Sequence, residues 1–295
     1  MSFITTIYAF SQEEAIKLED SVILSTGGFE MPILSENKNV ILLFKEEINN
    51  GSHKNLEDVL REAPNIIIQD TYFGPRVDIR GNGEKSISKV KILADGVSLS
   101  PIDDSMGTLP INTIPLNSIE KIEIVPGGGT VLNGSGSSGG IINIVTKSSL
   151  RKDFLVLEGG LKSYNFKNTG ISIGQNLTES LYGNFNYSYL KGNGYREGEF
   201  QESNSFSGGI DYFIDDKNRI KFQMSYFDEN RDYSTAVEKE LLEKNRKIKG
   251  FPVVSSSKRE RYSLDYEYKF SDSLTFLNTF YFQRYSREFT EETFM

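Results

Sequence analysis

Residues 262–270 read YSLDYEYKF, and this stretch decides the fold class that the sequence predicts. Its large apolar side chains alternate one by one with polar or charged side chains. A period of two residues is that of a β-strand, in which successive side chains point to opposite faces. The stretch therefore predicts a strand that carries Tyr262, Leu264, Tyr266, Tyr268 and Phe270 on one face and Ser263, Asp265, Glu267 and Lys269 on the other.

Six further stretches after Asp153 repeat this alternation, so the second half of the chain predicts about seven antiparallel strands. Each run is about 10 residues long, which is the length that a tilted strand needs to cross the hydrocarbon core of a bilayer. The predicted apolar faces carry Leu155, Leu157 and Leu161; Ile171 and Ile173; Leu181, Phe185, Tyr187 and Tyr189; Phe206, Ile210 and Tyr212; Ile220, Phe222, Met224 and Tyr226; and Phe276, Phe280 and Phe282.

The connections between these stretches indicate their environment. Tight polar turns are predicted at 175–180, 215–218 and 271–273, and they alternate with longer links at 191–200 and 228–258. Short turns at one end and long loops at the other are typical of outer-membrane barrels. A soluble β-sandwich is the alternative, but its outward faces are polar, whereas here one face of every strand is aromatic and aliphatic. We therefore predict transmembrane barrel strands.

The composition excludes several other classes of protein. The 33 Lys and Arg against 41 Asp and Glu give a formal net charge of −8, which disfavours a duplex-DNA binder. Zero Cys excludes disulfides, thiolate metal sites and a cysteine nucleophile, and a single His removes most imidazole chemistry. The mean hydropathy is −0.39, and no apolar run approaches the roughly 18 residues of a spanning helix. We expect neither an enzyme nor a cofactor, a metal site or a nucleic-acid partner.

The first half has a different pattern, which predicts a small α+β domain. Asn55 is expected to cap a short helix that Pro64 ends. Asp95 and Gly96 stand between two apolar runs and predict a hairpin, because both central residues of the favoured turn need positive φ. The predicted divisions are residues 1–11, 12–50, 51–150 and 151–295.

The first ten residues, MSFITTIYAF, are apolar, and Ala9, Phe10 and Ser11 have the small-x-small spacing of a cleavage site. We predict that residues 1–11 are a residual signal peptide and that residues 12–50 open the mature protein outside the cytoplasm. The alternative is an ordinary hydrophobic tail.

Five segments of the first half occur together in a specific order. They are NLEDVLREAPNI at 55–66, IRG at 79–81, ILADGVSL at 92–99, IEKIEI at 119–124 and GGIINIVTK at 139–147. In this order and at these spacings they resemble the plug domain of TonB-dependent outer-membrane receptors. The resemblance implies that residues 51–150 are a plug and that the strands after residue 150 begin a barrel of about 22 strands. Because only about seven are visible, we expect an incomplete barrel.

The resemblance also implies a function. Such receptors actively take up a scarce, bulky nutrient, most often a ferric siderophore or another iron complex, with haem and cobalamin as alternatives. The implied location is the outer membrane of a Gram-negative cell, with the plug and the amino terminus facing the periplasm. The implied partners are the TonB energy-transducing complex, outer-membrane lipid and an iron chelate or similar small molecule. A passive porin or a surface adhesin is the rival interpretation.

Residues 20–26, DSVILST, are similar to the TonB box of this family, in which an acidic residue precedes a β-branched run. An extended peptide of this kind can add a strand to the edge of a sheet in a partner protein. The alternative is an ordinary short strand or linker. The candidate residues are Asp20, Ser21, Val22, Ile23, Leu24 and Ser25.

The resemblance suggests that Arg80, Glu120 and Glu123 help to lock the plug to the barrel by charge pairing. The alternative for the two glutamates is a solvated strand face. The family usually has Arg-Gly-Pro after the second of these motifs, but this chain has Pro126 followed by three glycines. Tight turns, loops and close packing against a barrel wall are predicted for Gly81, Asp95, Gly96, Gly127, Gly128, Gly129, Gly139 and Gly140.

Overall fold

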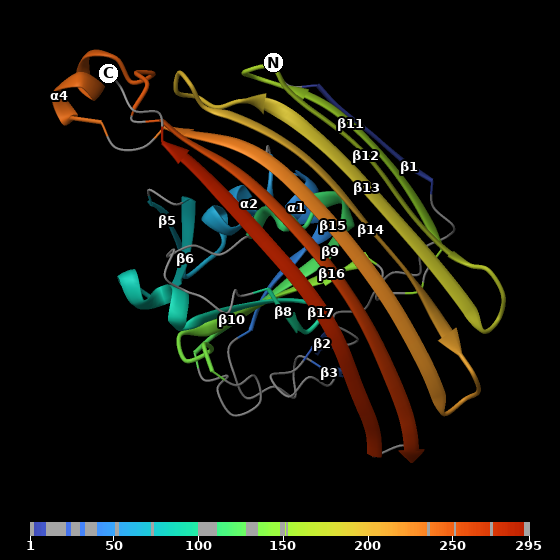
Figure 1. Cartoon of the computed structure of the whole chain (residues 1–295). Coiled ribbons are helices and arrows are strands. Elements are labelled where there is room, and N and C mark those ends of the chain that lie inside the picture. Colours follow the sequence, from blue (N-terminus) through green and yellow to red (C-terminus); the bar gives the residue numbers. More distant parts are fainter. Residues whose placement is uncertain are drawn as a thin grey trace. The chain divides into compact units, whose positions relative to one another are not determined.

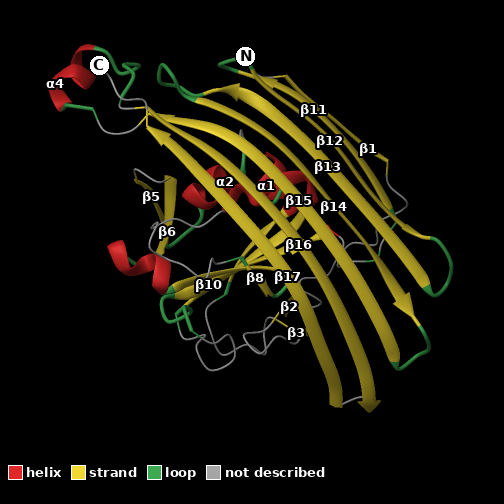
Figure 2. Ribbon diagram, in the orientation of Figure 1, coloured by secondary structure: helices red, strands yellow, loops and turns green. Residues whose placement is uncertain are grey.

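The structure is a computed structural model, and it describes residues 3–9, 22–24, 30–32, 40–50, 53–71, 74–99, 111–127, 135–147, 151, 153–234, 237–250, 252–271 and 274–291. The chain divides into two compact units, one of residues 12–149 and one of residues 1–11 with 150–295. Strands dominate both units (Figure 1, Figure 2), so the predicted mainly β fold is confirmed.

The unit of residues 12–149 is built on a five-stranded sheet. Its strands run in the order β4, β9, β10, β7, β8, with β7 parallel to β10 and the other pairs antiparallel. Two separate two-stranded sheets pair β2 with β3 and β5 with β6. The strands are β2 Val22–Leu24, β3 Glu30–Pro32, β4 Ile41–Phe44, β5 Ile66–Thr71, β6 Gly74–Ile79, β7 Val90–Ala94, β8 Val97–Ser98, β9 Ile119–Pro126 and β10 Gly140–Thr146.

Short α-helices and 3₁₀ helices also occur among the described residues of this unit. They are α1 Lys45–Asn50, α2 Leu56–Glu62, η3 Gly83–Ser88, η4 Ile111–Thr113 and η5 Leu116–Ser118. The Asn55 side chain accepts a hydrogen bond of 3.1 Å from the backbone N–H of Asp58, as predicted for the cap of α2. The helix ends at Glu62, before Pro64, because proline cannot continue it.

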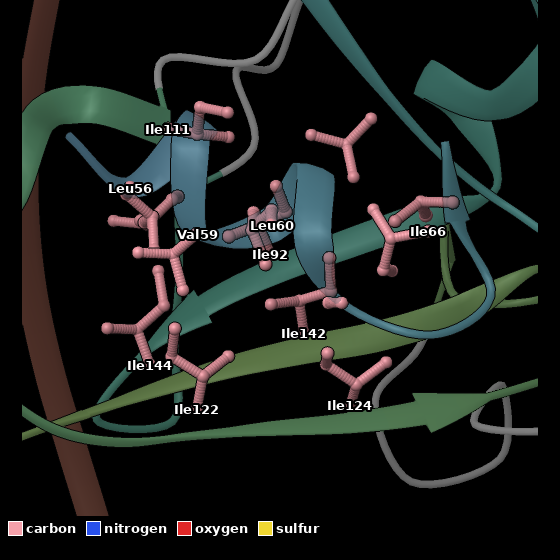
Figure 3. Packing of buried hydrophobic residues seen from close by; sticks show 14 of the residues in the cluster. Leu56, Val59, Leu60, Ile66, Ile92, Ile111, Ile122, Ile124, Ile142 and Ile144 are labelled. Carbon is pink, nitrogen blue, oxygen red and sulfur yellow. The ribbon is translucent and has the colours of Figure 1, made fainter. Parts of the chain in front are cut away.

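The core lies between α2 and one face of the five-stranded sheet (Figure 3). Leu56, Val59 and Leu60 follow the i, i+3, i+4 spacing that puts three side chains on one helical face. On the sheet, two rows of residues that are in register across β7, β10 and β9 form the other side of this core. One row is Ile92, Ile142 and Ile124, and the other is Ala94, Ile144 and Ile122, all of them buried.

The hairpin between β7 and β8 turns at Asp95 and Gly96, which have φ of 49° and 80°. This confirms the predicted positive φ at both positions. The Asp95 carboxylate accepts hydrogen bonds of 2.8 Å from the backbone N–H and the hydroxyl of Thr146. The turn is therefore fixed to the end of β10 as well as to its own strands.

We expect Gly96→Ala to lower the free energy of unfolding of this unit by about 1–2 kcal/mol, because a Cβ is disfavoured at left-handed φ. Urea unfolding followed by hydrogen exchange of the β7 and β8 amides measures the change. Gly159→Ala, in a strand of the other unit, is the control for adding a methyl group, because a Cβ there meets nothing within 4 Å and Gly159 does not have positive φ. It should leave the exchange of the β7 and β8 amides unchanged. An equal loss in both variants would contradict the assignment.

The described strands of the second unit form an eight-stranded antiparallel sheet, and these strands all curve in the same direction (Figure 1). Seven of its strands are those predicted from the alternation after Asp153. The eighth, β1 at Phe3–Ala9, pairs with β11, and the signal-peptide interpretation of this segment stays a prediction. The other strands are β11 Phe154–Lys162, β12 Phe166–Asn176, β13 Leu181–Asn193, β14 Phe200–Phe213, β15 Asn218–Ser234, β16 Pro252–Ser271 and β17 Leu274–Glu291.

The later strands are longer than the predicted 10 residues. β15, β16 and β17 have 17, 20 and 18 residues, and the predicted loop at 228–258 shrinks to residues 235–251, which include α4 at Lys239–Lys244. The reason is that apolar alternation stops near Tyr226 and Tyr262, whereas the backbone ladder continues through polar pairs such as Asp228 with Lys258. The pattern marks the apolar band of a strand and not its end.

Candidate functional site

The segment predicted to resemble a TonB box contains β2. Val22, Ile23 and Leu24 pair with Pro32, Met31 and Glu30 of β3 in an antiparallel ladder. Asp20, Ser21 and Ser25 lie outside the described residues. The segment is thus extended and able to pair along its backbone, as strand addition requires. Its role stays a prediction.

Arg80 is exposed and follows β6 at the start of a tight loop. Its backbone has φ of 62°, and its N–H donates to the carbonyl oxygen of Asn65 at 3.3 Å. Asp78 stabilises this loop. It is buried, and its carboxylate accepts 2.8 Å hydrogen bonds from the N–H groups of Asn82 and Gly83. A guanidinium nitrogen of Arg80 lies 3.6 Å from the position that a Cβ on Gly127 would take, so the side chain reaches towards the residue that follows β9. The locking role stays a prediction.

Glu120 lies at a β-bulge, where the pairing of β9 with β10 shifts register. The bulge moves Glu120 off the regular alternation of the strand, and its carboxylate lies 3.5 Å from the Nζ of Lys45 in α1. Both side chains are partly exposed, so this pair contributes at most about 1 kcal/mol. The ion pair described for Glu120 is thus inside the plug-like unit.

Glu123 is 1% exposed, so the alternative of a solvated strand face is wrong for this residue. It lies on the face of the sheet opposite to α2, where its carboxylate is 2.9 Å from the Nζ of Lys121. The Nδ2 of Asn143, directly across on β10, donates to the same carboxylate at 2.9 Å. The Oδ1 of Asn143 in turn accepts from the N–H of Gly96 at 3.2 Å. We call Lys121, Glu123, Asn143 and Gly96 the β9–β10 polar network.

The predicted turn glycines mostly have the expected backbone. Gly81 and Gly127 have φ of 78° and 80°. Gly140 has φ of 149°, and a Cβ there would lie 2.7 Å from Ile79 Cδ1 and 2.9 Å from the Val125 oxygen. Close packing at Gly140 is therefore with neighbouring segments of its own unit. Gly139 packs against Asn82 and Lys89, and Gly128 and Gly129 lie outside the described residues.

The second unit carries its apolar side chains on one face, in register from strand to strand. One row crosses all seven strands from β11 to β17 through Leu155, Ile173, Phe185, Gly208, Met224, Tyr262 and Phe282. Every large member of this row is exposed, up to 60% for Phe282. The faces predicted from the alternation are thus the faces that the ladder registers produce. A continuous exposed apolar surface of this kind marks an interaction with lipid or protein.

We expect Leu264→Arg, in the neighbouring row, to impair membrane insertion by about 2–4 kcal/mol, the cost of a lipid-facing arginine near the bilayer midplane. The fraction of chain that resists extraction from outer-membrane vesicles by urea measures the effect. Asp265→Arg, one residue along on the opposite face, is the control and should insert. Normal insertion of Leu264→Arg would contradict a lipid-facing role.

The other face of this sheet is polar and largely buried. Serines and asparagines occupy it on β12, β13, β14 and β16, together with buried charged groups. Asp211 of β14, one of the buried groups, contacts the partly exposed Arg151 and Arg219, and Arg219 also contacts the partly exposed Glu267 of β16. We call these four residues the β14 charge cluster. It was not predicted from the sequence, although a single aspartate among the serines on the polar face of β14 is a signal that could have found it.

The tight turn between β14 and β15 is closed by Asp215. Its carboxylate accepts hydrogen bonds from the Asn218 side chain at 2.9 Å and from the N–H groups of Lys217 and Asn218 at 2.8 Å. These hydrogen bonds, led by that of the Asn218 side chain, hold the pKa of Asp215 below its usual range. The aspartate therefore stays ionised, and the turn stays capped, to a lower pH than for an ordinary carboxylate.

Among the described residues, none of the helices is long and apolar enough to span a bilayer. No group of three or more His, Asp and Glu side chains able to hold a metal ion occurs in the part of the chain that the structure describes. The side chain of His53 is buried between the Ile48 carbonyl oxygen and the Glu62 carboxylate.

Comparisons with known proteins bear on both units. Residues 34–141 match the family described as TonB-dependent Receptor Plug Domain. The Vitamin B12 transporter BtuB of Vibrio vulnificus is 26% identical over 238 residues, which are 80% of this chain and 38% of that protein. The BtuB of Photobacterium profundum is 27% identical over 164 residues, 56% of this chain and 27% of that protein.

Two solved structures show the same fold. The ferric citrate transporter FecA in the unliganded form has a TM-score of 0.78 at 19% identity, over 88% of this chain and 42% of that one. The siderophore receptor PiuA from Acinetobacter baumannii has a TM-score of 0.74 at 18% identity, over 88% and 38%. The chain thus spans less than half the length of these proteins. Residues 34–141 are thus similar in sequence to the plug domain of TonB-dependent receptors, and the fold of the chain, β11–β17 included, is that of part of the solved FecA and PiuA structures.

Proposed function

We propose that this chain belongs to an outer-membrane receptor that takes up a scarce, bulky nutrient with energy delivered by TonB. The observation that carries the proposal is the combination of a plug domain at 34–141 with an exposed apolar row across seven antiparallel strands. The apolar face would contact outer-membrane lipid. The plug and the segment around β2 would face the periplasm, where TonB could add a strand to that segment.

An iron chelate of the siderophore type is the ligand that we propose first, because the plug motifs resemble those of receptors that most often carry such chelates. Cobalamin is the second candidate, because the curated relatives at 26–27% identity are vitamin B12 transporters. Both ligands are too large for passive diffusion through a narrow pore, so either would require movement of a plug.

A binding and uptake assay tests the proposal. Cells that express the receptor from its native gene are supplied with radiolabelled ferric citrate, ferric enterobactin or cyanocobalamin, with and without a protonophore. Binding of one ligand without the proton gradient, and its accumulation only with the gradient, is the expected result. Accumulation that is indifferent to the protonophore would favour a passive porin, and binding of none of the three would leave a surface adhesin as the better interpretation.

A further inference from the structure

The β14 charge cluster holds Arg151, which lies three residues before β11, to strands that are distant in sequence. β10 of the plug ends at Thr146 and β11 begins at Phe154, so Arg151 lies in the short link between the two units. Its Nε is 3.0 Å from the Asp211 carboxylate on β14. Its guanidinium also lies 4.1 Å from the centre of the Phe213 ring. The link is thereby fixed three strands away from β11.

Both carboxylate oxygens of Asp211, at the centre of this cluster, accept hydrogen bonds. The side chain of Asp211 is 2% exposed, and both of its oxygens accept hydrogen bonds from Arg219, at 2.7 and 2.6 Å. Such a bidentate pair is among the strongest and most directional ion pairs in proteins. Arg219 reaches on to Glu267 of β16 at 3.1 Å, so two cations balance two anions over three strands.

A second set of contacts holds the same link from the other side. The backbone N–H and the side-chain Nδ2 of Asn176, at the end of β12, donate to Asp153 at 2.7 and 2.8 Å. The Nδ2 also donates to the carbonyl oxygen of Arg151 at 3.2 Å. Arg151 itself has φ of 50°, so the chain makes a sharp turn at this point. Arg151 and Asp153 therefore contact β12 and β14 before β11 starts, and Asp211 and Arg219 connect them further to β15 and β16.

We propose that Arg151, Asp153, Asn176, Asp211, Arg219 and Glu267 form a tether clamp, which keeps a pulling force on the plug from reaching the barrel strands. A strand pulled from its end separates one hydrogen-bonded pair at a time, so β11 alone would be a weak anchor. The clamp spreads the load over four further strands. The link of residues 147–153 spans at most about 25 Å, so any larger movement of the plug loads the clamp directly. The inference rests on the proposed pulling of the plug.

Single-molecule pulling on the native receptor in outer-membrane vesicles tests the clamp, with the handle attached within residues 20–26, the segment that TonB is proposed to pull. In the wild-type protein, extension should end when the chain is drawn out to the link, and β11 should stay in place. In Arg151→Ala, release of residues 154–162, which form β11, should add about 30 Å, at about 3.4 Å per residue. This variant leaves the Asp211–Arg219 pair intact, so the sheet should still fold. Arg151→Lys, which keeps the charge and loses the planar guanidinium, should show the extra step in fewer traces than Arg151→Ala.

Lys191→Ala is the control, because it removes a 3.1 Å ion pair with Glu202 at the other end of the same sheet. It should behave as the wild-type protein. The clamp is disproved if Arg151→Ala stops at the same extension as the wild type, or if the wild type already releases β11. The handle replaces TonB and needs neither ligand nor proton gradient. A negative result therefore concerns the clamp, whereas a failed uptake assay concerns the proposed function.

Discussion

Deletion of residues 20–26 should abolish energised uptake while leaving ligand binding intact. The deletion removes β2, whose only described sheet partner is the three-residue strand β3, so the five-stranded sheet and its core keep all their described contacts. Strand addition uses the backbone N–H and C=O groups of the segment, which the deletion removes. We expect accumulation of the radiolabelled ligand to fall to the level seen with a protonophore.

A single substitution separates loss of pairing from loss of the segment. Ile23→Pro removes one backbone N–H and disfavours strand pairing, so it should reproduce the deletion. Ile23→Val keeps the β-branched side chain and the N–H, and should transport normally. Full uptake by the deletion variant would sink the energy-coupling role of this segment, and a passive porin would behave in that way. Loss of binding as well as uptake would instead show that the segment supports the plug fold.

The strand faces of the second unit could be predicted because a period of two carries the information by itself. Residues such as Phe185 and Phe282, almost a hundred positions apart, were assigned to apolar faces independently, and the ladder registers place them in one row. The Asp95–Gly96 turn was predictable for a different reason, since its backbone conformation admits few residue types. Both features depend on local sequence.

The burial of individual side chains and the residues they contact could not be predicted, because both depend on which strands become neighbours. Alternation places Glu123 on a face but does not say that the face is buried, nor that Asn143 lies directly opposite. Glu120 and Glu123 are three residues apart, so strict alternation would place them on opposite faces, and it does not reveal the bulge at Glu120. The β14 charge cluster joins Arg151 to Asp211 across 60 residues, and only the register of four strands reveals it.

The β9–β10 polar network puts a buried carboxylate where the sequence suggests either a lock or a solvated surface. Two partners hold Glu123 inside the plug: the ammonium group of Lys121 and the amide of Asn143. Asn143 also holds the N–H of Gly96, so the network joins β9, β10 and the β7–β8 hairpin. Burying an ionised carboxylate costs free energy unless such partners compensate for the lost water. The buried groups of Lys121 and Asn143 likewise need the carboxylate as their acceptor.

We therefore expect Glu123→Ala to lower the free energy of unfolding of the plug by about 3–5 kcal/mol. The substitution leaves the mostly buried ammonium group of Lys121 and the amide donor of Asn143 without the carboxylate. Glu120→Ala is the matched control on the same strand and should cost less than about 1 kcal/mol, since its pair with Lys45 is partly exposed. Urea unfolding followed by hydrogen exchange of the β9 and β10 amides distinguishes the two. If Glu123 served only to lock the plug to the barrel, its replacement would leave the exchange of these amides unchanged, and the internal network would then have no stabilising role.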